Sequence, residues 1–376
     1  MLIDVVFWVA VCGVVYPYVG YPLVLWLLGL VAPARRGDGA ASGLPPVSMI
    51  VPVHNEAARI VRKVANTAAL RYPADRLQVI YVSDGSTDET MPLLREHAGA
   101  RATIVELVER RGKAAALNAG VERATNEILV FSDASIELAP DALEAVVEPF
   151  ADPRIGCVSG EDHIPESGGE AWYGRYELLL RRLESRVHSI VGASGSFYAQ
   201  RRALCAPFAE GMAPDFLSVL RTVDQGFRAV SEPKATGSMT SVKDPRGEFE
   251  RKVRTLIRGM TTLFAHVRVM NPLRHGVFAF SLVSHKVMRW AAPLFLVVAW
   301  VAPLARLDSP WYAAAFAAQT VFYAGALAAF GQWGRLHLSL PGKVALYFAT
   351  VNAAALVAWV QYGRGVRQEL WAPTRR

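Results

Sequence analysis

The sequence predicts an α/β domain with a largely parallel central sheet, placed between transmembrane helices at both ends of the chain. Apolar residues make up 52% of the 376 residues, and they concentrate in residues 2–32 and 287–363. Between these regions, short β-branched runs alternate with helical patterns, which is typical of a parallel sheet covered by helices. The net charge is +7, and many basic residues adjoin the apolar runs, which favours an anionic membrane surface over nucleic acid as the partner.

Residues 1–32 are predicted to form the first transmembrane helix. The apolar run exceeds the length of about 20 residues that spans a bilayer, and no Lys or Arg precedes it as in a secretory signal. Arg35 and Arg36 follow the run, so the positive-inside rule places the N-terminus outside and the next domain in the cytoplasm. Pro17 and Pro22 lie inside the helix and are expected to kink it.

Residues 45–262 are expected to form the α/β domain. The predicted strands are Val47–Val53, Leu77–Val82, Thr103–Leu107 and Ile128–Phe131. The predicted helices are Ala57–Leu70, Ser86–His97 with a capping box of Ser86 and Glu89, Lys113–Ala124, and Pro140–Phe150. Because ligands of such sheets bind beyond the carboxyl ends of the strands, Asp84 and Asp133 are expected on the same rim.

Three more transmembrane helices are predicted within residues 287–363, after an interfacial segment at 263–286 and before a basic tail at 364–376. They are Val287–Leu307, Trp311–Phe330 and Val344–Tyr362. The apolar stretch Phe278–Val283 is too short to span a bilayer and is expected to lie on the inner surface. Four spans from an outside N-terminus place the tail outside, whereas its arginines favour the inside, so the side of the tail stays open.

Several polar residues lie where phosphate or metal chemistry is expected. Asp133 directly follows a strand, as a Mg²⁺ ligand would, and the alternative is a solvated loop acid. Asp84 also follows a strand, and a ligand role and a turn role are equally open. Lys113 follows Gly112 at the start of a helix, where the helix N-terminus favours phosphate.

Two roles are open for each of the next candidate sites along the chain. Asp215 lies at the start of the predicted helix Phe216–Phe227, where it is either an N-cap or a general base. Arg251 and Arg254 are three residues apart on one helix face, which either clamps a diphosphate or faces anionic lipid. The three cysteines form no Cys-x-x-Cys pair, which argues against a zinc site or a disulfide framework.

Together, these segments resemble the family 2 glycosyltransferases with a GT-A fold, and most closely their membrane-bound, cellulose-synthase-like branch. The resemblance extends from about Val47 to Arg258. It rests on seven segments in the expected order: Val51–Glu56, Val82–Asp88, Arg111–Lys113 with Leu117–Asn118, Phe131–Ser135, Gly192–Gly195, Pro214–Phe216 with Gly226–Arg228, and Phe249–Arg254.

The resemblance implies roles on the donor side of the site. Pro52, His54 and Asp84 would surround the nucleoside, Glu56 would support that loop, and Lys113 would lie near the diphosphate. Asp133 stands at the first acid of the family's Asp-x-Asp metal motif, which implies a divalent cofactor, Mg²⁺ or Mn²⁺. The second acid is replaced by Ser135, which leaves the metal site with one carboxylate fewer than the family pattern.

On the acceptor side, the resemblance implies that Asp215 is the catalytic base and that Ser194 and Gly195 line the acceptor site. Arg251 and Arg254 match an arginine-bearing segment that contacts the diphosphate. Two departures concern this side. Pro214 stands where the family often has an acid. Thr255 replaces a Trp linked to processive polymerases, which puts long-chain synthesis in doubt.

The resemblance therefore implies an inverting enzyme that moves a sugar, expected to come from a UDP-sugar, to a lipid-linked or polysaccharide acceptor in cell-surface glycan or exopolysaccharide synthesis. The expected location is the inner cell membrane, with several spans, a cytoplasmic catalytic domain, and contacts with membrane lipids and other polysaccharide-synthesis proteins but not nucleic acid. One alternative is a polyprenyl-phosphate glycosyltransferase. Another is a non-enzymatic export or transport subunit, against which the scarcity of charges in the apolar runs argues.

Overall fold

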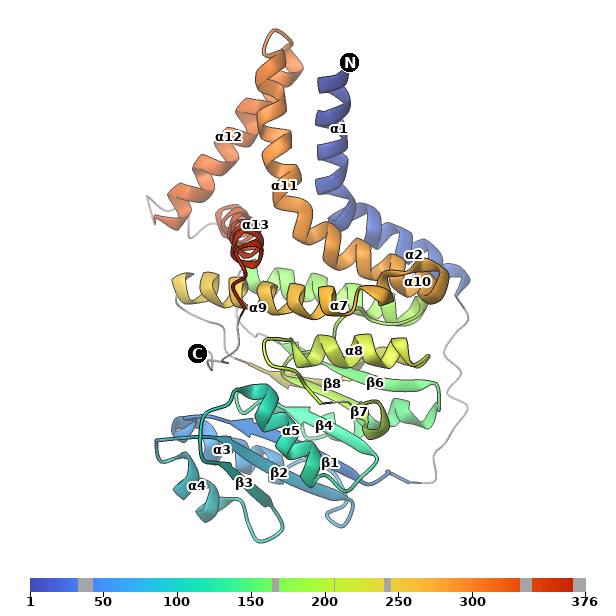
Figure 1. The fold of residues 1–376 in the computed structure, drawn as a ribbon, viewed down its shortest axis with the longest axis vertical. Coiled ribbons are helices and arrows are strands. Elements are labelled where there is room, and N and C mark those ends of the chain that lie inside the picture. The colour runs from blue at the N-terminus through green and yellow to red at the C-terminus, as the bar shows by residue number, and fades with distance from the viewer. Residues whose placement is uncertain (33–42, 164–168, 206, 240–244, 332–339, 368–376) are drawn as a thin grey trace.

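The computed structural model describes residues 1–32, 43–163, 169–205, 207–239, 245–331 and 340–367. Its centre is a sheet of eight strands in the order β3-β2-β1-β4-β7-β6-β8-β5 (Figure 1). The first four strands in the chain are parallel to one another: β1 (Val47–Val53), β2 (Leu77–Asp84), β3 (Thr103–Leu107) and β4 (Ile128–Ser132). They form the parallel half of the sheet that the sequence predicts.

The second half of the sheet is mixed. Its strands are β5 (Glu137–Leu138), β6 (Ile155–His163), β7 (Phe197–Arg201) and β8 (Arg228–Ser238). Strand β7 runs antiparallel to both β4 and β6, whereas β6 and β8 are parallel. The prediction of an α/β domain with a largely parallel sheet is confirmed, and the antiparallel strands β7 and β5 are the parts that strand–helix alternation did not reveal.

Helices cover both faces of the sheet. One apolar cluster joins a sheet face to α5 (Lys113–Arg123), α8 (Pro214–Asp224) and α9 (Pro245–Ala265). A second cluster joins the other face to α3 (Ala57–Ala68), α4 (Thr90–His97) and α6 (Ala142–Val147), which a 3₁₀ turn at Glu148–Ala151 follows. Strands β1 and β4 are buried along their whole length because both faces are covered, which explains their continuous apolar sequence.

The predicted capping box of Ser86 and Glu89 is wrong. Helix α4 begins at Thr90, and the backbone N–H of Thr90 donates to Asp88 Oδ1 at 3.0 Å. The hydroxyl of Ser86 instead lies 2.9 Å from Ser83 Oγ, in the turn that follows β2. A polar turn therefore separates β2 from α4.

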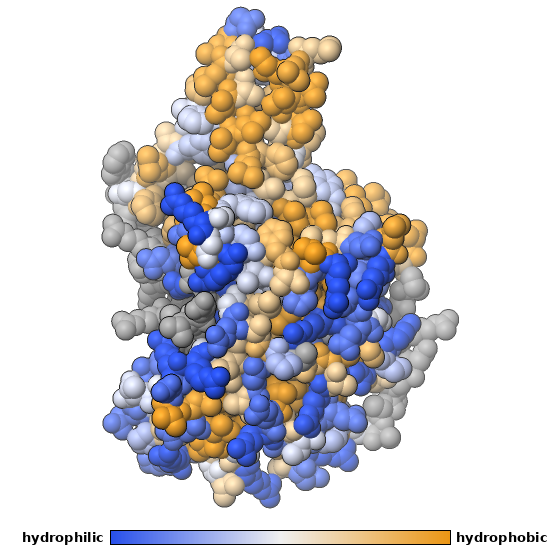
Figure 2. All heavy atoms as spheres, viewed as in Figure 1, coloured by the Kyte–Doolittle hydropathy of each residue, from blue (hydrophilic) through white to orange (hydrophobic). Residues whose placement is uncertain are grey.

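Within the described residues, four helical stretches are long and apolar enough to span a membrane: Leu2–Val31, Pro272–Arg306, Pro310–Phe330 and Gly342–Gly363. Three of them form an upper projection that is mainly hydrophobic, above a largely hydrophilic sheet domain (Figures 1 and 2). They contain α1 (Leu2–Val15), α2 (Tyr21–Val31), α10 (Pro272–Leu282), α11 (Met288–Val301) and α12 (Pro310–Phe330). The fourth lies within α13 (Leu340–Gly363).

Both of the first two stretches bend. A π-helical turn at Tyr16–Gly20, which begins next to Pro17, separates α1 from the oblique α2 (Figure 1). A similar turn at Val283–Val287 joins α10 to α11. Here the structure differs from the expectation of a separate interfacial segment, because Phe278–Val283 belongs to the same continuous helix as the following span. Phe278–Val283 is therefore the lower part of a bent helix.

An intermediate layer separates the sheet from these helices. It contains α9 and α7 (Gly169–Val187), which lie between the strands and the membrane-spanning segments (Figure 1). Helix α7 contacts α2, and α9 contacts α13. Through α7 and α9, the sheet domain is therefore in direct contact with segments from both ends of the chain.

Candidate active site

A small cleft at the carboxyl ends of β1 and β4 brings together five of the residues singled out from the sequence. They are Pro52, Lys113, Asp133, Gly195 and Asp215, and Phe131 and Tyr198 form part of the apolar wall. These residues come from five separate segments of the chain. The rim of the sheet is therefore the point where the predicted donor and acceptor sides meet.

Asp133 and Lys113 form an ion pair inside this cleft. Lys113 Nζ lies 2.5 Å from Asp133 Oδ1 and donates to the backbone carbonyl of Gly195 at 3.1 Å. The backbone N–H of Asp133 donates to the carbonyl of Ser196 at 2.9 Å, which fixes the loop against the start of β7. The lysine therefore supplies a positive charge beside the one carboxylate that the sequence assigned to a metal.

Asp84, which the resemblance places near the nucleoside, also contacts the loop that precedes Lys113. Its buried carboxylate accepts the backbone N–H groups of Arg111 at 2.7 Å and Gly112 at 2.8 Å. Those bonds hold the loop that precedes Lys113, and Gly112 has the positive φ of 90° that glycine adopts without strain. His54 Nδ1 lies 2.7 Å from the backbone carbonyl of Asp84. Asp84 and His54 thus shape the same rim that Pro52 lines.

Glu56 is part of the support of this rim. Its side chain is 5% exposed, and one carboxylate oxygen lies 3.0 Å from the guanidinium of Arg59. Burial raises the pKa of Glu56, and the hydrogen bond from Arg59 opposes that rise. Its backbone N–H donates to Thr90 Oγ1 at 2.8 Å, which joins the rim to α4.

Asp215 is not an N-cap. Helix α8 starts at Pro214, the N-cap position is Ala213, and the side chain at that position makes no capping hydrogen bond. The Asp215 carboxylate lies beside Gly195: a Cβ at Gly195 would be 3.8 Å from its Cγ. Glycine at 195 therefore keeps space in front of the carboxylate, as the approach of a substrate hydroxyl requires.

Ser194 was expected to line the acceptor site, but its side chain makes contacts inside the protein. It is fully buried, and its hydroxyl donates to the carboxylate of Asp162 at 2.7 Å while it accepts the backbone N–H of Phe197 at 3.0 Å. These contacts shape the turn before β7, so Ser194 positions Gly195 and Gly195 faces the cleft.

Arg251 and Arg254 of α9, which were expected to clamp a diphosphate together, each have an acidic partner on the same helix. Arg251 makes a two-pronged contact with Glu248, with both N···O distances at 2.8 Å. Arg254 has Glu250 at 3.8 Å. Arg258, which the sequence reasoning did not select, is the arginine that the Asp215 charge affects: burial lowers its pKa, and Asp215 opposes that change. Arg258 lies four residues after Arg254, and this spacing in the sequence could have indicated that the two arginines are neighbours on the helix.

Lys63 is a second residue that sequence reasoning missed. It is buried on α3 beneath the Asp133 loop, and Nζ donates to Ser132 Oγ at 2.7 Å and to the carbonyl of Ile136 at 3.0 Å. Burial lowers the pKa of Lys63 to about 7, although the charges of Asp133 and Glu137 oppose the change. Lys63 thus ties together both ends of the loop that carries Asp133.

We expect Lys63→Met to lower the free energy of unfolding by about 1–3 kcal/mol, because two buried acceptors lose their donor. In EDTA, wild type should also become more stable relative to this variant between pH 7 and pH 9. The folded pKa lies below the unfolded value, so the unfolded chain binds more protons in that window. Thermal unfolding in detergent measures both effects, and the exposed neighbour Arg62→Gln is the control. A constant difference across the pH range would contradict the assignment.

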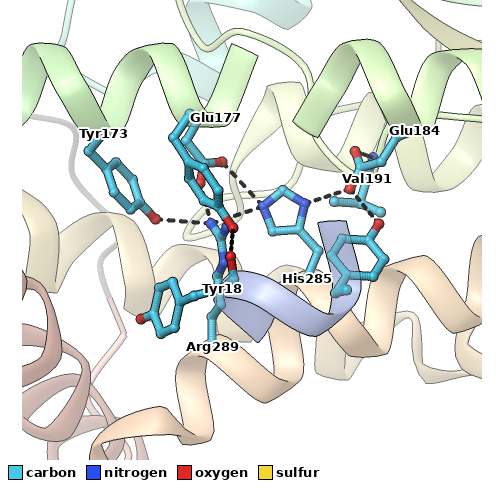
Figure 3. A network of polar contacts seen from close by, with 9 residues as sticks. Tyr18, Tyr173, Glu177, Glu184, Val191, His285 and Arg289 are labelled. Carbon is cyan, nitrogen blue, oxygen red and sulfur yellow. Dashed lines mark hydrogen bonds and ion pairs between the residues drawn. The ribbon is translucent and has the colours of Figure 1, made fainter. Parts of the chain in front are cut away.

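Glu184 forms the centre of a polar network that joins the acceptor side to the membrane helices (Figure 3). Its carboxylate accepts from Tyr21 Oη of α2 at 2.7 Å and from the backbone N–H of Val191 at 3.1 Å, and it lies 2.6 Å from His285 Nδ1. Val191 is four residues before Gly195. A single buried carboxylate therefore fixes the loop to Gly195 against segments from both ends of the chain.

The network continues from His285 to Glu177 and Arg289. His285 Nε2 lies 3.2 Å from a Glu177 carboxylate oxygen, and Arg289 forms an ion pair with the same carboxylate (Figure 3). Arg289 also donates to Tyr173 Oη at 3.0 Å. No motif indicated this network, because its members are scattered over α2, α7 and the turn before α11.

Replacing Glu184 with Gln should raise the acceptor KM by about tenfold, because an amide nitrogen cannot accept a hydrogen bond and the loop before Gly195 loses a contact. Nucleotide affinity should stay unchanged, since Lys113 and Asp133 belong to other segments. Tyr21→Phe is the matched variant, because it removes a bond to the same carboxylate but leaves the Val191 contact. Equal losses in donor and acceptor binding would indicate a general fold defect instead.

Comparison with known proteins agrees with this geometry. The model of the family described as "Glycosyl transferase family 2" matches residues 48–205. The chain contains a family 2 glycosyltransferase domain. The matched residues include the rim, the Asp133 loop and the Gly195 turn. The sheet and its helices give this glycosyltransferase domain the GT-A fold that the resemblance implied.

Relatives of this chain match over part of their length. Poly-beta-1,6-N-acetyl-D-glucosamine synthase of Staphylococcus aureus is 32% identical over 132 residues, which are 35% of this chain and 32% of that protein. Glycosyltransferase AglE of Haloferax volcanii is 30% identical over 138 residues, which are 36% of this chain and 45% of that protein. The matched part thus spans about a third to a half of these relatives.

A solved structure matches nearly the whole chain. It is the mannosyltransferase PcManGT from Pyrobaculum calidifontis in complex with GDP-Man and Mn²⁺. The likeness has a TM-score of 0.73 and 28% identity, and it covers 95% of this chain and 98% of that one. The likeness therefore includes the membrane-spanning helices as well as the GT-A domain.

The donor groups of the cleft fit a divalent metal with few protein ligands. Among the described residues, no group of three or more His, Cys, Asp and Glu side chains gathers in one place. Mg²⁺ commonly binds through one or two carboxylates together with substrate phosphates and water. Asp133 can provide one carboxylate, and Ser135 on the same loop is half-buried. A metal here would depend on donor phosphates to complete its ligand shell.

Proposed function

We propose that the protein is a membrane-bound inverting glycosyltransferase that moves a sugar from a nucleoside diphosphate to a lipid-linked or glycan acceptor. The observation that supports this best is the cleft in which Asp133, Lys113, Gly195 and Asp215 meet. In this proposal Lys113 and the carboxylate of Asp133, which would bind a metal, serve the donor side, and Asp215, which is not an N-cap, serves the acceptor side. That pairing suits a single displacement at the anomeric carbon.

In the proposed reaction, Asp215 takes the proton of an acceptor hydroxyl while that oxygen forms a bond to the anomeric carbon. The bond from this carbon to the diphosphate oxygen breaks, and the nucleoside diphosphate leaves with the electron pair. Lys113 then balances charge on the departing diphosphate. A divalent metal bound at Asp133 would supply Lewis-acid stabilisation of the same group.

The proposed nucleoside site is the rim formed by Pro52, His54 and Asp84, with Glu56 behind it. The sequence resemblance suggested a UDP-sugar. The GDP-Man in the similar structure of PcManGT makes GDP-mannose the first donor to test beside UDP-sugars. The proposed location is the inner cell membrane, with the glycosyltransferase domain on the cytoplasmic side, because Arg35 and Arg36 follow the first span.

A donor screen tests this proposal. The purified full-length protein is incubated with UDP- and GDP-sugars, Mg²⁺ or Mn²⁺, and a membrane lipid extract as acceptor. We expect release of nucleoside diphosphate from one donor, dependent on both metal and extract, with a labelled sugar appearing in the lipid fraction. Failure to bind or turn over any nucleotide sugar would overturn the proposal and favour a transport or export role.

A further inference from the structure

An apolar groove lies at the level of the membrane-spanning helices, bounded by α9, α12 and α13. Its volume is about 440 Å³, and its walls include Phe249 of α9, Leu327 and Phe330 of α12, and Leu346, Ala349 and Ala353 of α13. Figure 1 shows α13 above α9, with α12 at the same end of the molecule. The groove therefore offers an apolar chain a place beside the layer that covers the catalytic domain.

One face of α9 leads from this groove to the active site. Glu250, Arg254, Arg258 and Thr262 recur every four residues, so consecutive members are neighbours along a face that turns slowly around α9. Glu250 also lines the groove. At the other end, Thr262 Oγ1 accepts the backbone N–H of Ala213 at 2.9 Å, two residues before Asp215. With a rise of about 1.5 Å per residue, this face extends about 18 Å from the groove to the start of α8.

The arginines on this face carry positive charge that the described protein groups do not fully balance. Arg258 Nε is buried and has no hydrogen-bond partner among the described residues. Arg254 has Glu250 only at 3.8 Å, and both ends of that pair reach solvent. A buried charged group without a partner is costly, and a guanidinium matches phosphate oxygens in a two-pronged geometry. Asp215 cannot serve as a fixed partner if it has to accept a proton.

We propose that the acceptor is an amphiphile bearing a phosphate or diphosphate, whose chain lies in the groove and whose phosphate contacts Arg258. This inference rests on the proposed function and names its acceptor class: a lipid carrier whose attached sugar hydroxyl reaches Asp215. Arg258 comes from the membrane side of the domain, whereas Lys113 and Asp133, which are expected at the donor phosphates, belong to the sheet side. The anion at Arg258 is thus assigned to the acceptor.

Binding of farnesyl phosphate tests the proposal, with farnesol and inorganic phosphate as comparison probes. The full-length protein is placed in phosphatidylcholine nanodiscs, and dissociation constants are measured for each probe. We expect farnesyl phosphate to bind about tenfold or more tightly than farnesol, as one charge-assisted contact allows. Inorganic phosphate should compete weakly. Strong competition by inorganic phosphate, or equal binding of farnesol, would overturn the proposal.

Two variants separate the headgroup from the chain. Arg258→Gln should remove the preference for farnesyl phosphate over farnesol, and Ala353→Trp should weaken both ligands about tenfold by filling the groove. The matched controls are Arg274→Gln, an exposed arginine paired with Asp224, and Val360→Trp, an exposed site elsewhere on α13. Both controls should stay within about twofold of wild type.

Nucleotide binding distinguishes the failure of this inference from the failure of the proposed function. GDP and UDP affinities, measured with Mn²⁺, should be the same in wild type and Arg258→Gln. If Arg258→Gln weakens nucleotide but not farnesyl phosphate, Arg258 serves the donor and the inference is overturned. If wild type binds neither nucleotide, the proposed function fails as well. Thermal unfolding and Arg258→Lys, which keeps the charge, exclude a folding defect as the cause of a loss.

Discussion

Replacing Asp215 with Asn should lower the rate of sugar transfer by about 10²–10⁴, the range that removal of a general base usually gives. The carboxylate lies beside Gly195 in the cleft, the N-cap of α8 is Ala213 rather than Asp215, and the proposed function assigns this carboxylate to the acceptor side. The amide has nearly the same shape but cannot take the proton from an acceptor hydroxyl. Nucleotide affinity should change little, because the donor-side residues belong to other segments.

The measurement is single-turnover transfer with the donor found in the screen, together with nucleotide binding to the same preparation. Glu210→Gln is the control, since Glu210 is an exposed acid five residues before Asp215. Near-normal turnover by Asp215→Asn would contradict its role as base. That result would favour the polyprenyl-phosphate alternative, in which an already ionised phosphate oxygen attacks the anomeric carbon.

Asp133→Asn should lower kcat by about 10²–10³ and weaken the response to Mn²⁺, because several kcal/mol of charge stabilisation depend on the metal. The substitution removes the carboxylate charge that a divalent metal would bind and that Lys113 contacts at 2.5 Å. Chelation of metal from the wild-type enzyme should produce a similar loss, and added Mn²⁺ should reverse it.

Activity as a function of Mn²⁺ concentration checks this expectation, with Glu137→Gln, at the start of β5 just after the Asp133 loop, as the control. Ser135→Asp provides a test in the opposite direction: restoring the second acid of the motif should lower the Mn²⁺ concentration at half-maximal activity. An Asp133→Asn enzyme with unchanged Mn²⁺ dependence would show that the metal binds elsewhere.

The rim of the site could be predicted because its residues follow apolar strands directly. Strand β1 is continuous in apolar character, and in β2 and β4 the polar residues begin where the strand ends, so Asp84 and Asp133 could be assigned to one edge. The partners of these residues could not be predicted in the same way. Asp84 holds backbone N–H groups 27 and 28 residues later, and such contacts leave no periodic pattern in the sequence.

In the helical regions, too, the sequence predicted the elements but not the contacts between them. The apolar runs predicted four spans, but the bend that joins α10 to α11 depends on packing against α7 and α2. Lys63 and Glu184 escaped notice because each is a single charged residue on an amphipathic helix, where exposure is the usual outcome. Only the tertiary structure shows that Lys63 lies under the Asp133 loop and that Glu184 contacts three separate segments.

The contacts of Glu184 also bear on when the enzyme becomes active during its synthesis. Tyr21 is made early and His285 late, and both reach the carboxylate that holds the loop before Gly195. A nascent chain that has completed its sheet domain still lacks the His285 contact. The loop before Gly195 therefore has its full set of contacts only once the second bent helix lies beside the first, so the site is complete only in a chain whose two bent helices are already paired.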